Sequence, residues 1–445
     1  MSRPFHVVVL AAGRGTRMKS EMPKVLFDIC GRPALLHVVL AGASLGAKSS
    51  TVVVSPDSRA ACEAALGEVP VSVTVQDPPL GTGHAARVGL EAAAPGPGAD
   101  VLILYGDGPL YTTQTIRDLL KAHADGGDAR GATLLSAEID DPTGYGRVVV
   151  GADGGVERIV EELDADDATR AIREINTGIM VLRGDAGAEV LSGLSNDNAK
   201  GEYYLTDVVE AMGGRGLAVG RVVLHDSDEA GAYNSIEELG VVRDLMRRRI
   251  IRGHQANGVD VVDPSSTWID VGVEIGAGTR VLPFTVITRG VVIGKSCVIG
   301  PFSHLRPAAE LADGAEVGNF VEVKKSYLGE KAKAKHLSYI GDATIGAGTN
   351  IGCGTITANW DGKTKHPTKV GAGAFIGSGT VLIAPTTVED GGVTGAGAVV
   401  KRGSTIGADE VWVGVPARPI GTKTTRSPES PESIDNPADS EGEEI

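Results

Sequence analysis

A loop rich in glycine and cationic residues follows the first apolar segment of the chain. His6 to Ala12 is a continuous apolar run, and Gly-Arg-Gly-Thr-Arg-Met comes directly after it at residues 13–18, with Lys24 just beyond. Glycines let a phosphate approach the backbone closely, and Arg17 and Lys24 supply positive charge. The loop is neither a Walker motif nor a GxGxxG fingerprint, because Met18 takes the third glycine position. We expect a phosphate-binding loop of another kind.

Asp107 is a second residue that could do chemistry. It ends an apolar run in the sequence Tyr-Gly-Asp. A carboxylate that faces a cleft is a natural ligand for Mg²⁺. The alternative is a turn or capping aspartate that binds nothing, and the residue type alone leaves both readings open.

The elements that must carry these residues form an α/β pattern. Helical segments alternate with buried strands, which predicts a mostly parallel, doubly wound, Rossmann-like sheet with ligands at the carboxyl ends of its strands. The loops after the first strand and after the strand that ends at Asp107 are then the informative ones. After the first strand, a helix is expected from the Pro33 region, and strands at Ser50–Val54, Val71–Gln76, Val101–Gly106, Ala132–Ile139 and Ile179–Leu182.

In the second half of the chain, an aliphatic residue recurs at every sixth position. A left-handed parallel β-helix is built this way, because each short strand contributes one inward aliphatic side chain and three strands close a coil of about 18 residues. The register slips by one residue at Leu328 and at Ile345, breaks at a polar excursion from Ala358 to Lys369, and returns at Val370. The regular aliphatic positions are Ile275, Val281, Ile287, Ile293, Ile299, Leu305, Leu311, Val317 and Val323.

Four segments are expected along the chain. Residues 1–234 form the α/β domain and residues 255–425 the β-helix. Between them, residues 235–254 form a linker helix, because apolar residues recur there at spacings of three or four. Its arginine run at 247–249 is more typical of a solvated or interface face than of an anion site. Residues 426–445 form an acidic tail that is too poor in apolar residues to order.

Composition excludes several classes of function. The net charge is −15, and the seven acids after Ser427 leave about −8 on the rest, which argues against a nucleic-acid partner. The four cysteines have no metal-type spacing and are expected to be reduced thiols. The sequence has no apolar stretch of about 20 residues, so membrane insertion is not expected, and no signal peptide is recognisable. A soluble cytoplasmic protein is expected.

The motifs, taken together, resemble a known family. Leu-Ala-Ala-Gly-Arg-Gly-Thr-Arg-Met with Pro-Lys resembles the signature of sugar-1-phosphate nucleotidyltransferases, and five further motifs follow in family order. Joined to hexapeptide repeats, the set resembles the bacterial bifunctional enzymes that acetylate glucosamine-1-phosphate and then uridylylate the product. The resemblance spans roughly Val7 to Pro416. The further motifs are QDPPLGTGHA at 76–85, YGDGPL at 105–110, PTGYGRV at 142–148, EINTGI at 174–179 and GEYYLTD at 201–207.

The resemblance implies roles for the first site. UTP and N-acetylglucosamine-1-phosphate would give UDP-N-acetylglucosamine and pyrophosphate, with Arg17 and Lys24 as the catalytic cations and Asp107 and Asn234 as the Mg²⁺ ligands. Gln76, Gly81 and Thr82 match the positions that read uracil. The other implied substrate residues are Leu10, Gly13, Tyr105, Gly106, Gly146, Glu161 and Asn176.

The resemblance implies a second site in the β-helix. His336 matches the general base that takes a proton from the amine during transfer from acetyl-CoA. Related enzymes are homotrimers whose acetyl site uses neighbouring chains. The implied residues for glucosamine-1-phosphate are Arg306, Lys324, Tyr339, Asn350, Asn359 and Lys365, and those for acetyl-CoA are Cys353, Ser378 and Ala396.

The chain departs from the family pattern in several places. Gly108 stands where an aliphatic residue is usual, which we expect to loosen that loop, and Trp360 replaces a residue that is more often Tyr. Before Arg306 the chain is shorter than the pattern by more than one coil. Gly414 lies near the position of an arginine that contacts the coenzyme, for which Arg418 is a substitute. Acetyl-CoA binding is therefore the least supported expectation.

Three other functions fit parts of the sequence. A monofunctional uridylyltransferase with a structural or regulatory β-helix has no need for Arg306, Lys324 and His336. A non-catalytic assembly subunit has no need for Lys24 and Asp107. A glucose-1-phosphate pyrophosphorylase shares the fold but not the acetyltransferase motif. The sequence therefore favours the bifunctional transferase.

Overall fold

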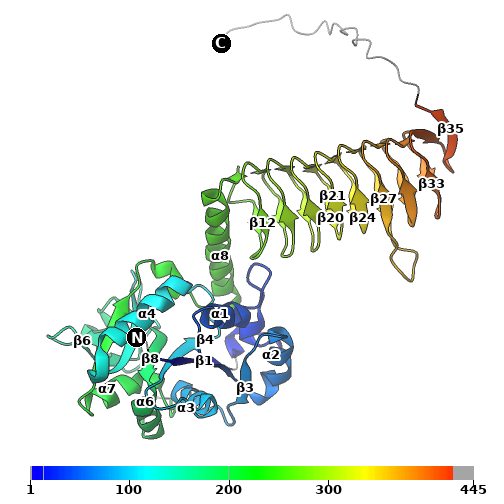
Figure 1. Cartoon of the computed structure of the whole chain (residues 1–445). Helices are drawn as coiled ribbons and strands as arrows, with labels where there is room; N and C mark the ends of the chain where they lie inside the picture. The colour runs from blue at the N-terminus through cyan, green and yellow to red at the C-terminus, as the bar shows by residue number, and fades with distance from the viewer. Residues whose placement is uncertain (1–2, 14, 199, 424–445) are drawn as a thin grey trace, which may run out of the picture. The chain divides into compact units, whose positions relative to one another are not determined.

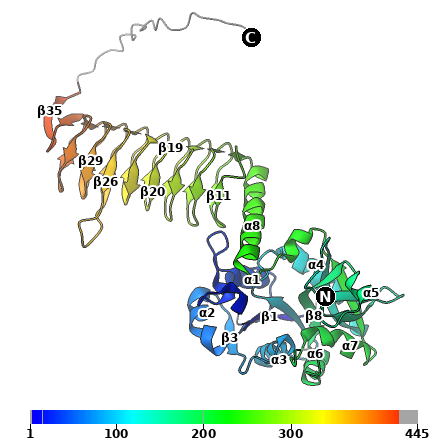
Figure 2. The same ribbon diagram turned by 180° about the vertical axis from the view of Figure 1, so that it is seen from behind.

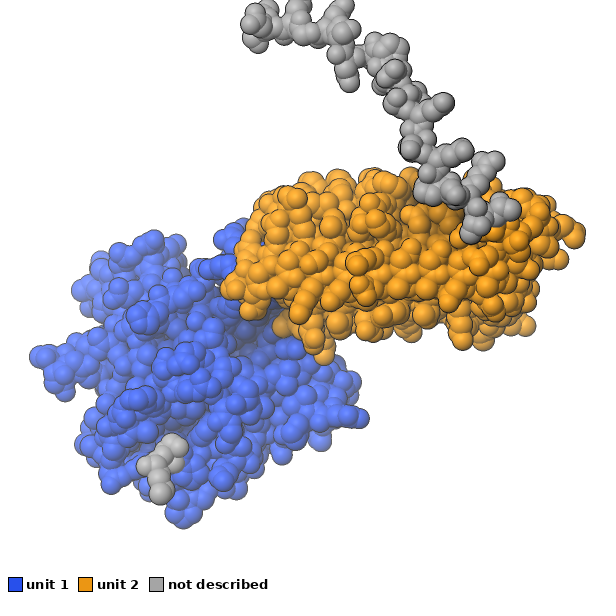
Figure 3. All heavy atoms as spheres, turned by 45° about the horizontal axis from the view of Figure 1, so that its top comes forward, with its two compact units in different colours: residues 1–252 blue, residues 253–445 orange. Residues whose placement is uncertain are grey.

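The computed structural model describes residues 3–13, 15–198 and 200–423 (Figures 1 and 2). The chain divides into two compact units, residues 1–252 and residues 253–445 (Figure 3). The acidic tail expected at 426–445 lies outside the described residues.

A mixed sheet forms the centre of the first unit, in the order β3-β2-β1-β4-β8-β5-β9. Strand β1 pairs in parallel with β2 and β4, whereas β8 runs antiparallel to both β4 and β5, and the β6–β7 hairpin joins β8. The mostly parallel α/β sheet is confirmed, with two reversed strands, β7 and β8, that the sequence did not reveal. The strands are β1 Phe5–Ala11, β2 Ser50–Val54, β3 Ser72–Val75, β4 Asp100–Tyr105, β5 Arg130–Glu138, β6 Arg147–Val150, β7 Val156–Val160, β8 Glu174–Arg183 and β9 Ala218–Val223.

Helices cover both faces of this sheet, and the alternation of β1 shows why. Val7 and Val9 pack with residues of α1, α2 and α4, whereas Val8 and Leu10 pack with residues of α3, α6 and α7. Side chains of a strand point alternately to its two faces, so an all-apolar strand needs a cover on each. The helices are α1 Ala34–Ala43, α2 Arg59–Leu66, α3 Thr82–Ala93, α4 Thr113–Asp125, α5 Asp167–Arg170, α6 Gly184–Ser192 and α7 Val208–Gly213.

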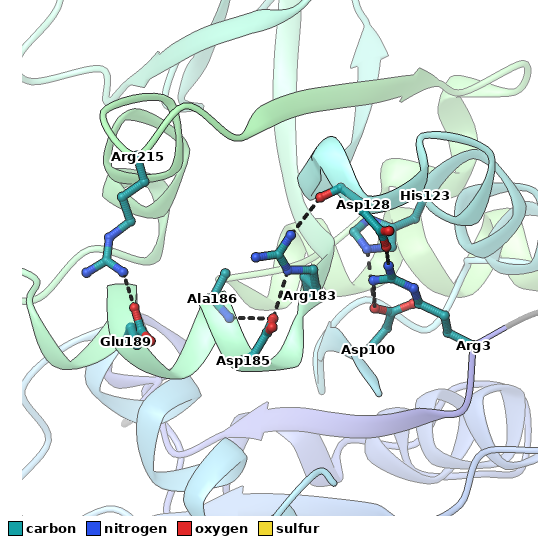
Figure 4. Close-up of polar contacts among 9 residues, drawn as sticks. All are labelled: Arg3, Asp100, His123, Asp128, Arg183, Asp185, Ala186, Glu189 and Arg215. Carbon is teal, nitrogen blue, oxygen red and sulfur yellow. Dashed lines mark hydrogen bonds and ion pairs between the residues drawn. The ribbon is translucent and has the colours of Figure 1, made fainter. Parts of the chain in front are cut away.

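The edge where β1 and β4 begin holds charged residues with structural partners (Figure 4). Asp100 starts β4 and is buried, with Arg3 Nη1 at 3.7 Å and His123 Nε2 at 3.6 Å from its Oδ1. Arg183 ends β8 beside Asp100 and donates to the carbonyl of Asp128 at 2.7 Å. These charges therefore tie strand ends together and leave the opposite edge for ligands.

The linker helix is α8, Ile236–Ala256, close to the bounds expected from sequence. Leu239, Val242 and Met246 are buried along it, which is the predicted apolar stripe. The arginine run has partners within this unit, because Arg247 pairs with Asp244 and Arg249 donates to a backbone carbonyl. No helix among the described residues is long and apolar enough to cross a bilayer. Each of the four cysteines is an unbridged thiol, as predicted.

The second unit is a rod of stacked three-strand coils, the left-handed β-helix predicted from sequence (Figure 1). The first sheet contains β10 Asp260–Val261, β13 Arg280–Val281, β16 Val298–Ile299, β19 Glu316–Asn319, β22 Lys333–His336, β25 Asn350–Ile351, β28 Phe375–Ile376, β31 Val393–Thr394 and β34 Glu410–Val413, with β35 Arg418–Thr422 antiparallel at its end. The second contains β11 Trp268–Ile269, β14 Val286–Ile287, β17 His304–Leu305, β20 Glu322–Lys324, β23 Tyr339–Gly341, β26 Ile356–Ala358, β29 Val381–Ile383 and β32 Val399–Val400. The third contains β12 Glu274–Ile275, β15 Val292–Ile293, β18 Glu310–Leu311, β21 Tyr327–Leu328, β24 Ala343–Ile345, β27 Thr368–Val370, β30 Thr386–Val388 and β33 Thr405–Ile406.

The register of the coils follows the sequence pattern. Val323 stacks on Leu305, and Leu328 stacks on Leu311 one residue early, as the slip predicted. Threonines at 357 and 394 take inward positions where aliphatic residues were absent. The polar excursion is a loop between β26 and β27. We name the turns from the first sheet to the second corner 1, and those from the second sheet to the third corner 2.

Close contact between coils predicts how one glycine contributes to stability. A Cβ at Gly346 would lie 2.4 Å from the backbone nitrogen of Ala372 in the next coil. We expect Gly346→Ala to destabilise the β-helix by about 1–3 kcal/mol, seen as earlier thermal unfolding by circular dichroism. Gly240→Ala is the control, because a Cβ there meets nothing within 4 Å in an exposed stretch of α8 and should stabilise by up to about 1 kcal/mol. Unchanged unfolding of Gly346→Ala would contradict the packing argument.

Candidate active sites

A cleft of about 650 Å³ opens at the carboxyl ends of β1 and β4, the edge that the sheet topology predicts. Its walls come from the loop after β1, the start of α3 and the segment after β4. Arg17 is exposed and Lys24 is almost buried there. Of the predicted residues, those that line the cleft are Leu10, Gly13, Arg17, Lys24, Gln76, Gly81, Thr82, Tyr105, Asp107 and Asn234.

Three predicted residues meet at one point in this cleft. Lys24 Nζ donates to Asp107 Oδ2 and, at 2.8 Å, to Asn234 Oδ1. The neighbouring Tyr233 fixes this lysine, because its hydroxyl donates to the Lys24 carbonyl at 2.6 Å and its ring lies 5.5 Å from Nζ. Tyr233 was not predicted, although it directly precedes Asn234. Residues 210 positions apart thus present one cation between two oxygen ligands.

The amide nitrogen of Gln76 already has partners within the chain. Its Nε2 donates to the Gly81 carbonyl at 2.9 Å and lies 3.2 Å from His84 Nδ1. Burial lowers the pKa of His84, so its Nδ1 accepts from Gln76 as a neutral imidazole. Gln76 Oε1 is therefore left to accept a hydrogen bond from a ligand. His84 was not predicted as a functional residue, and only its place inside the motif at 76–85 indicated it.

The segment after β4 is packed more tightly than its glycines predict. A Cβ at Gly108 would lie 2.9 Å from Cε2 of Tyr111, so the tyrosine ring fills the space of the usual aliphatic side chain. Gly106 does not line the cleft, and its N–H donates to the Leu10 carbonyl at 2.9 Å. The sequence expectation that Gly108 loosens this loop is therefore not supported, and Gly106 has a structural place behind the cleft.

The predicted sugar residues form a group beside the cleft, outside its lining. Asn176 N–H donates to the Gly146 carbonyl at 2.8 Å, and a Cβ at Gly146 would lie 3.5 Å from Glu161 Oε1. Glu161 also accepts from Thr206 Oγ1 at 3.4 Å. The charge of Glu161 acts on the Tyr105 hydroxyl, which burial already keeps protonated by raising its pKa. Tyr105 is thus the residue that links the cleft to this group.

Asp207 adds a carboxyl group with a raised pKa to the same region. Burial, and then the negative charge of Glu161, raise the pKa of Asp207 from 3.8 to about 6. Burial likewise raises the pKa of Glu161. Two carboxylates that disfavour each other's ionisation cost stability wherever both are charged.

This cost predicts a pH-dependent effect of one substitution. The folded pKa of Asp207 lies above the unfolded value, so its contribution to stability falls as pH rises from about 4 through about 6. Asp207→Asn should raise the free energy of unfolding by about 1 kcal/mol at pH 8, after allowance for partial exposure, and by little at pH 4.5. Thermal unfolding at both pH values measures this. Asp57→Asn, at an exposed carboxylate, is the control. An equal effect at both pH values would contradict the argument.

The β-helix gathers three predicted cations at corner 2. The pKa of Lys324 is lowered, first by contact with the Lys365 ammonium and then by the charge of Arg306. Arg306 Nη1 also donates to Glu322 at 2.6 Å. Like charges repel unless an anion lies among them, so this cluster is suited to a phosphate.

His336 lies at corner 1, at the end of β22. Its Nδ1 is 2.8 Å from Asn319 Oδ1, one coil earlier. A carboxamide oxygen can only accept, so Nδ1 is the donor of this pair, and in the neutral ring Nε2 then carries the lone pair that a base needs. Asn319 was not predicted, although its separation from His336 is one coil length in this part of the chain.

The remaining predicted residues are divided between faces of the rod. Asn359 Nδ2 lies 3.3 Å from the Tyr339 hydroxyl and also donates to Asp342, so these residues adjoin the cation cluster at corner 2. Asn350 belongs to the first sheet, pairs with Lys333, and is not brought to that cluster within one chain.

The three residues assigned to acetyl-CoA stack in one column at corner 1. The N–H of Gly379 donates to the Cys353 carbonyl at 2.7 Å, and that of Gly397 to the Ser378 carbonyl at 2.7 Å. Ala396 lies in the same turn as Gly397. The column begins at His336, whose carbonyl accepts from the N–H of Gly354 at 3.4 Å. Gly414 and Arg418 lie beyond it, where β34 turns into β35.

Comparisons with known proteins found relatives of both units of the chain. Residues 7–174 match the MobA-like NTP transferase domain, and residues 290–325 match the bacterial transferase hexapeptide family (six repeats). Proteins called "Bifunctional protein GlmU" from Thermobifida fusca, Pelotomaculum thermopropionicum and Streptomyces coelicolor are 44%, 43% and 38% identical. These matches cover 94%, 85% and 90% of this chain and 94%, 89% and 90% of the relatives. The chain therefore belongs to the GlmU family of bifunctional proteins.

Proposed function

We propose that the chain synthesises UDP-N-acetylglucosamine by two reactions. The β-helix transfers the acetyl group of acetyl-CoA to glucosamine-1-phosphate, and the α/β unit then transfers uridylyl from UTP to the product. The observation that carries the proposal is that one chain holds two separate groups of cations and polar residues, one at Lys24 and one at Lys324, each suited to an anionic sugar phosphate. The cytoplasmic location expected from sequence stays a prediction.

Uridylyl transfer in the cleft is a phosphoryl displacement. An oxygen of the sugar phosphate forms a bond to the α-phosphorus of UTP, and the bond to the bridging oxygen breaks, so pyrophosphate leaves with the electron pair. Two anions must meet, so the work of the protein is to position them and offset their charge. Lys24 and Arg17 line the cleft as the cations for this task.

Uracil recognition follows from the hydrogen bonds of Gln76. Because Nε2 is engaged with Gly81 and His84, Oε1 accepts from the N3–H of a base. Uracil has this hydrogen, and neutral cytosine does not. Specificity through a required buried hydrogen bond is stronger than specificity through shape, because the wrong base leaves the amide unpaired.

Asp107 and Asn234 suit a magnesium ion. Their oxygens converge on one point, at which a cationic Nζ already lies, and oxygen ligands are the ones that Mg²⁺ prefers. Among the described residues no group of three His, Cys, Asp or Glu side chains could hold a metal, so such an ion would depend on nucleotide phosphates for further ligands. When bound, Mg²⁺ would offset phosphate charge.

Acetyl transfer needs a base and a phosphate clamp. His336 Nε2 takes the proton as the amine nitrogen bonds to the thioester carbonyl, and the C–S bond then breaks to release CoA. The phosphate of the acceptor is held by three cations, which we name the phosphate clamp: Arg306, Lys324 and Lys365. A β-helix that served only as a scaffold would gain nothing from three cations that repel each other.

We further propose that the chain assembles as a homotrimer through the β-helix. Phe284, Phe302 and Phe320 stack along corner 1, with ring centroids 4.7 and 5.3 Å apart, and each is about half exposed. Leu337 continues the column beside His336 and is 57% exposed. An apolar ladder that leads to the catalytic base supports a contact with a second copy at that site.

Two substitutions test the assignment of the two reactions. His336→Ala should lower acetyl-dependent release of CoA by at least about a hundredfold and leave pyrophosphate release intact, because only one reaction needs the base. Asp107→Ala should have the reverse effect. CoA thiol and pyrophosphate are assayed on the same preparations, with glucosamine as the control acceptor. Loss of both activities in either folded variant would overturn the two-site assignment.

A charge placed in the ladder tests the trimer. Phe302→Glu should convert the trimer to smaller species and lower acetyl transfer with it, because a carboxylate would be desolvated at an apolar contact. Uridylyl transfer should persist. Light scattering during gel filtration gives the mass, and Val292→Glu, at an exposed position of β15 in the third sheet, is the control. A stable Phe302→Glu trimer would show that the ladder is not the contact.

A further inference from the structure

The loop between β26 and β27 is a small hairpin with its own hydrogen bonds, and it projects from the rod in Figure 1. Trp360 and Lys365 form an antiparallel bridge, and the N–H of His366 donates to the Asn359 carbonyl at 2.8 Å. The loop carries two predicted acceptor residues, Asn359 and Lys365, so its position decides whether they reach the phosphate clamp.

Asp361 organises the tip of this loop. Its Oδ1 accepts from the N–H groups of Thr364 at 2.8 Å and Lys363 at 2.9 Å. Hydrogen bonds hold the pKa of Asp361 well below its usual range. The bond from the Thr364 N–H contributes most, followed by those from His366 and Lys363. The lowered pKa favours the ionised carboxylate, which can accept hydrogen bonds from partners outside the hairpin as well.

The other oxygen of Asp361 ties the hairpin to a distant coil. Oδ2 accepts from Arg402 Nη2 at 3.1 Å, and His366 Nε2 lies between the two partners, 2.7 Å from Oδ2 and 2.5 Å from Arg402 Nη2. Arg402 lies at corner 2 between β32 and β33, 41 residues further along the chain. We name Asp361, His366 and Arg402 the latch. Each of the three comes from corner 2, the corner of the phosphate clamp.

Electrostatics explains why the clamp needs a latch. Lys365 directly precedes His366, and its ammonium is in contact with that of Lys324, near Arg306. Before a phosphate binds, repulsion among these cations favours movement of the hairpin away from the rod. The attraction between Asp361 and Arg402 opposes that movement at the other side of the same hairpin. A binding site held in place in advance loses less affinity to ordering when the ligand arrives.

We propose that Arg402 is a positioning residue for acetyl transfer, which holds Lys365 in the phosphate clamp through Asp361 and His366. The inference rests on the proposed function of the β-helix, and Arg402 itself does not contact the acceptor. The Arg402 side chain is 47% exposed, and an exposed ion pair contributes little to overall stability. The effect of its loss should therefore appear in acceptor binding and not in unfolding.

The test compares Arg402→Met with Arg402→Lys in the full-length protein. We expect Arg402→Met to raise KM for glucosamine-1-phosphate about tenfold, because small displacements of a clamp cost this much or more. KM for acetyl-CoA, uridylyl transfer and the unfolding midpoint should change little. Arg402→Lys keeps the charge and should restore KM to within about threefold of the original. Lys369→Met, at an exposed cation of β27 outside the latch, is the control.

Several results would overturn the proposal. An unchanged KM in Arg402→Met would mean that the hairpin holds itself, and an equal rise in both KM values with earlier unfolding would mean a general structural role. Calorimetric titration with glucosamine-1-phosphate, against glucosamine, measures the same contrast without turnover. Phosphate-dependent binding without CoA release would refute the proposed activity, while the affinity of Arg402→Met would still decide whether the latch exists.

Discussion

The main physical constraint on this molecule is that cations must be gathered where anions will meet. In the α/β unit a single lysine lies between two oxygen ligands, and its charge is balanced by Asp107. In the β-helix three cations adjoin, and one of them, Arg306, donates to the Glu322 carboxylate at 2.6 Å. The two units therefore differ in how their cations are balanced: Asp107 lies directly against Lys24 in the first, whereas in the second the Lys324 and Lys365 ammonium groups are in contact with each other.

The sheet and the β-helix bring their cationic and polar residues together in different ways. In the sheet, neighbouring parallel strands end together, so Leu10 and Tyr105 reach one edge although they are distant in sequence, and buried partners such as Tyr233 can fix a single side chain. In the β-helix, residues one coil apart stack at one corner, so a column of cations forms without any long-range loop. The third cation of the proposed clamp, Lys365, comes instead from the hairpin between β26 and β27.

How far the sequence predicted the molecule depends on the range of the interactions. The six-residue period fixed the inward residues of the rod, including the slips at Leu328 and Ile345, because each strand needs one inward side chain. Motif order also indicated the residues around the cleft. Asn319 was missed because no motif includes it, although the predicted coil length and the slip at Leu328 place it one coil before His336. His84 and Tyr233 orient other side chains and carry no pattern of their own. Strand β8 was expected, but its antiparallel direction is set by pairing with β4, which local sequence does not encode.

Corner 1 shows how a single column can serve two purposes. The turns of corner 1 contain equivalent positions with positive φ. In chain order these positions are Phe284, Phe302, Phe320, Leu337 and the glycines at 354, 379 and 397. The backbone conformation is the same throughout, and glycine adopts it without strain, whereas the bulky residues occupy it at a cost. That cost is reasonable only if the side chains gain contacts outside the chain, and the glycines leave the continuation of the same corner bare. His336 lies where the change occurs. The proposed apolar contact with another copy and the proposed coenzyme groove would then meet at His336, so assembly and acetyl transfer would depend on one corner of the rod.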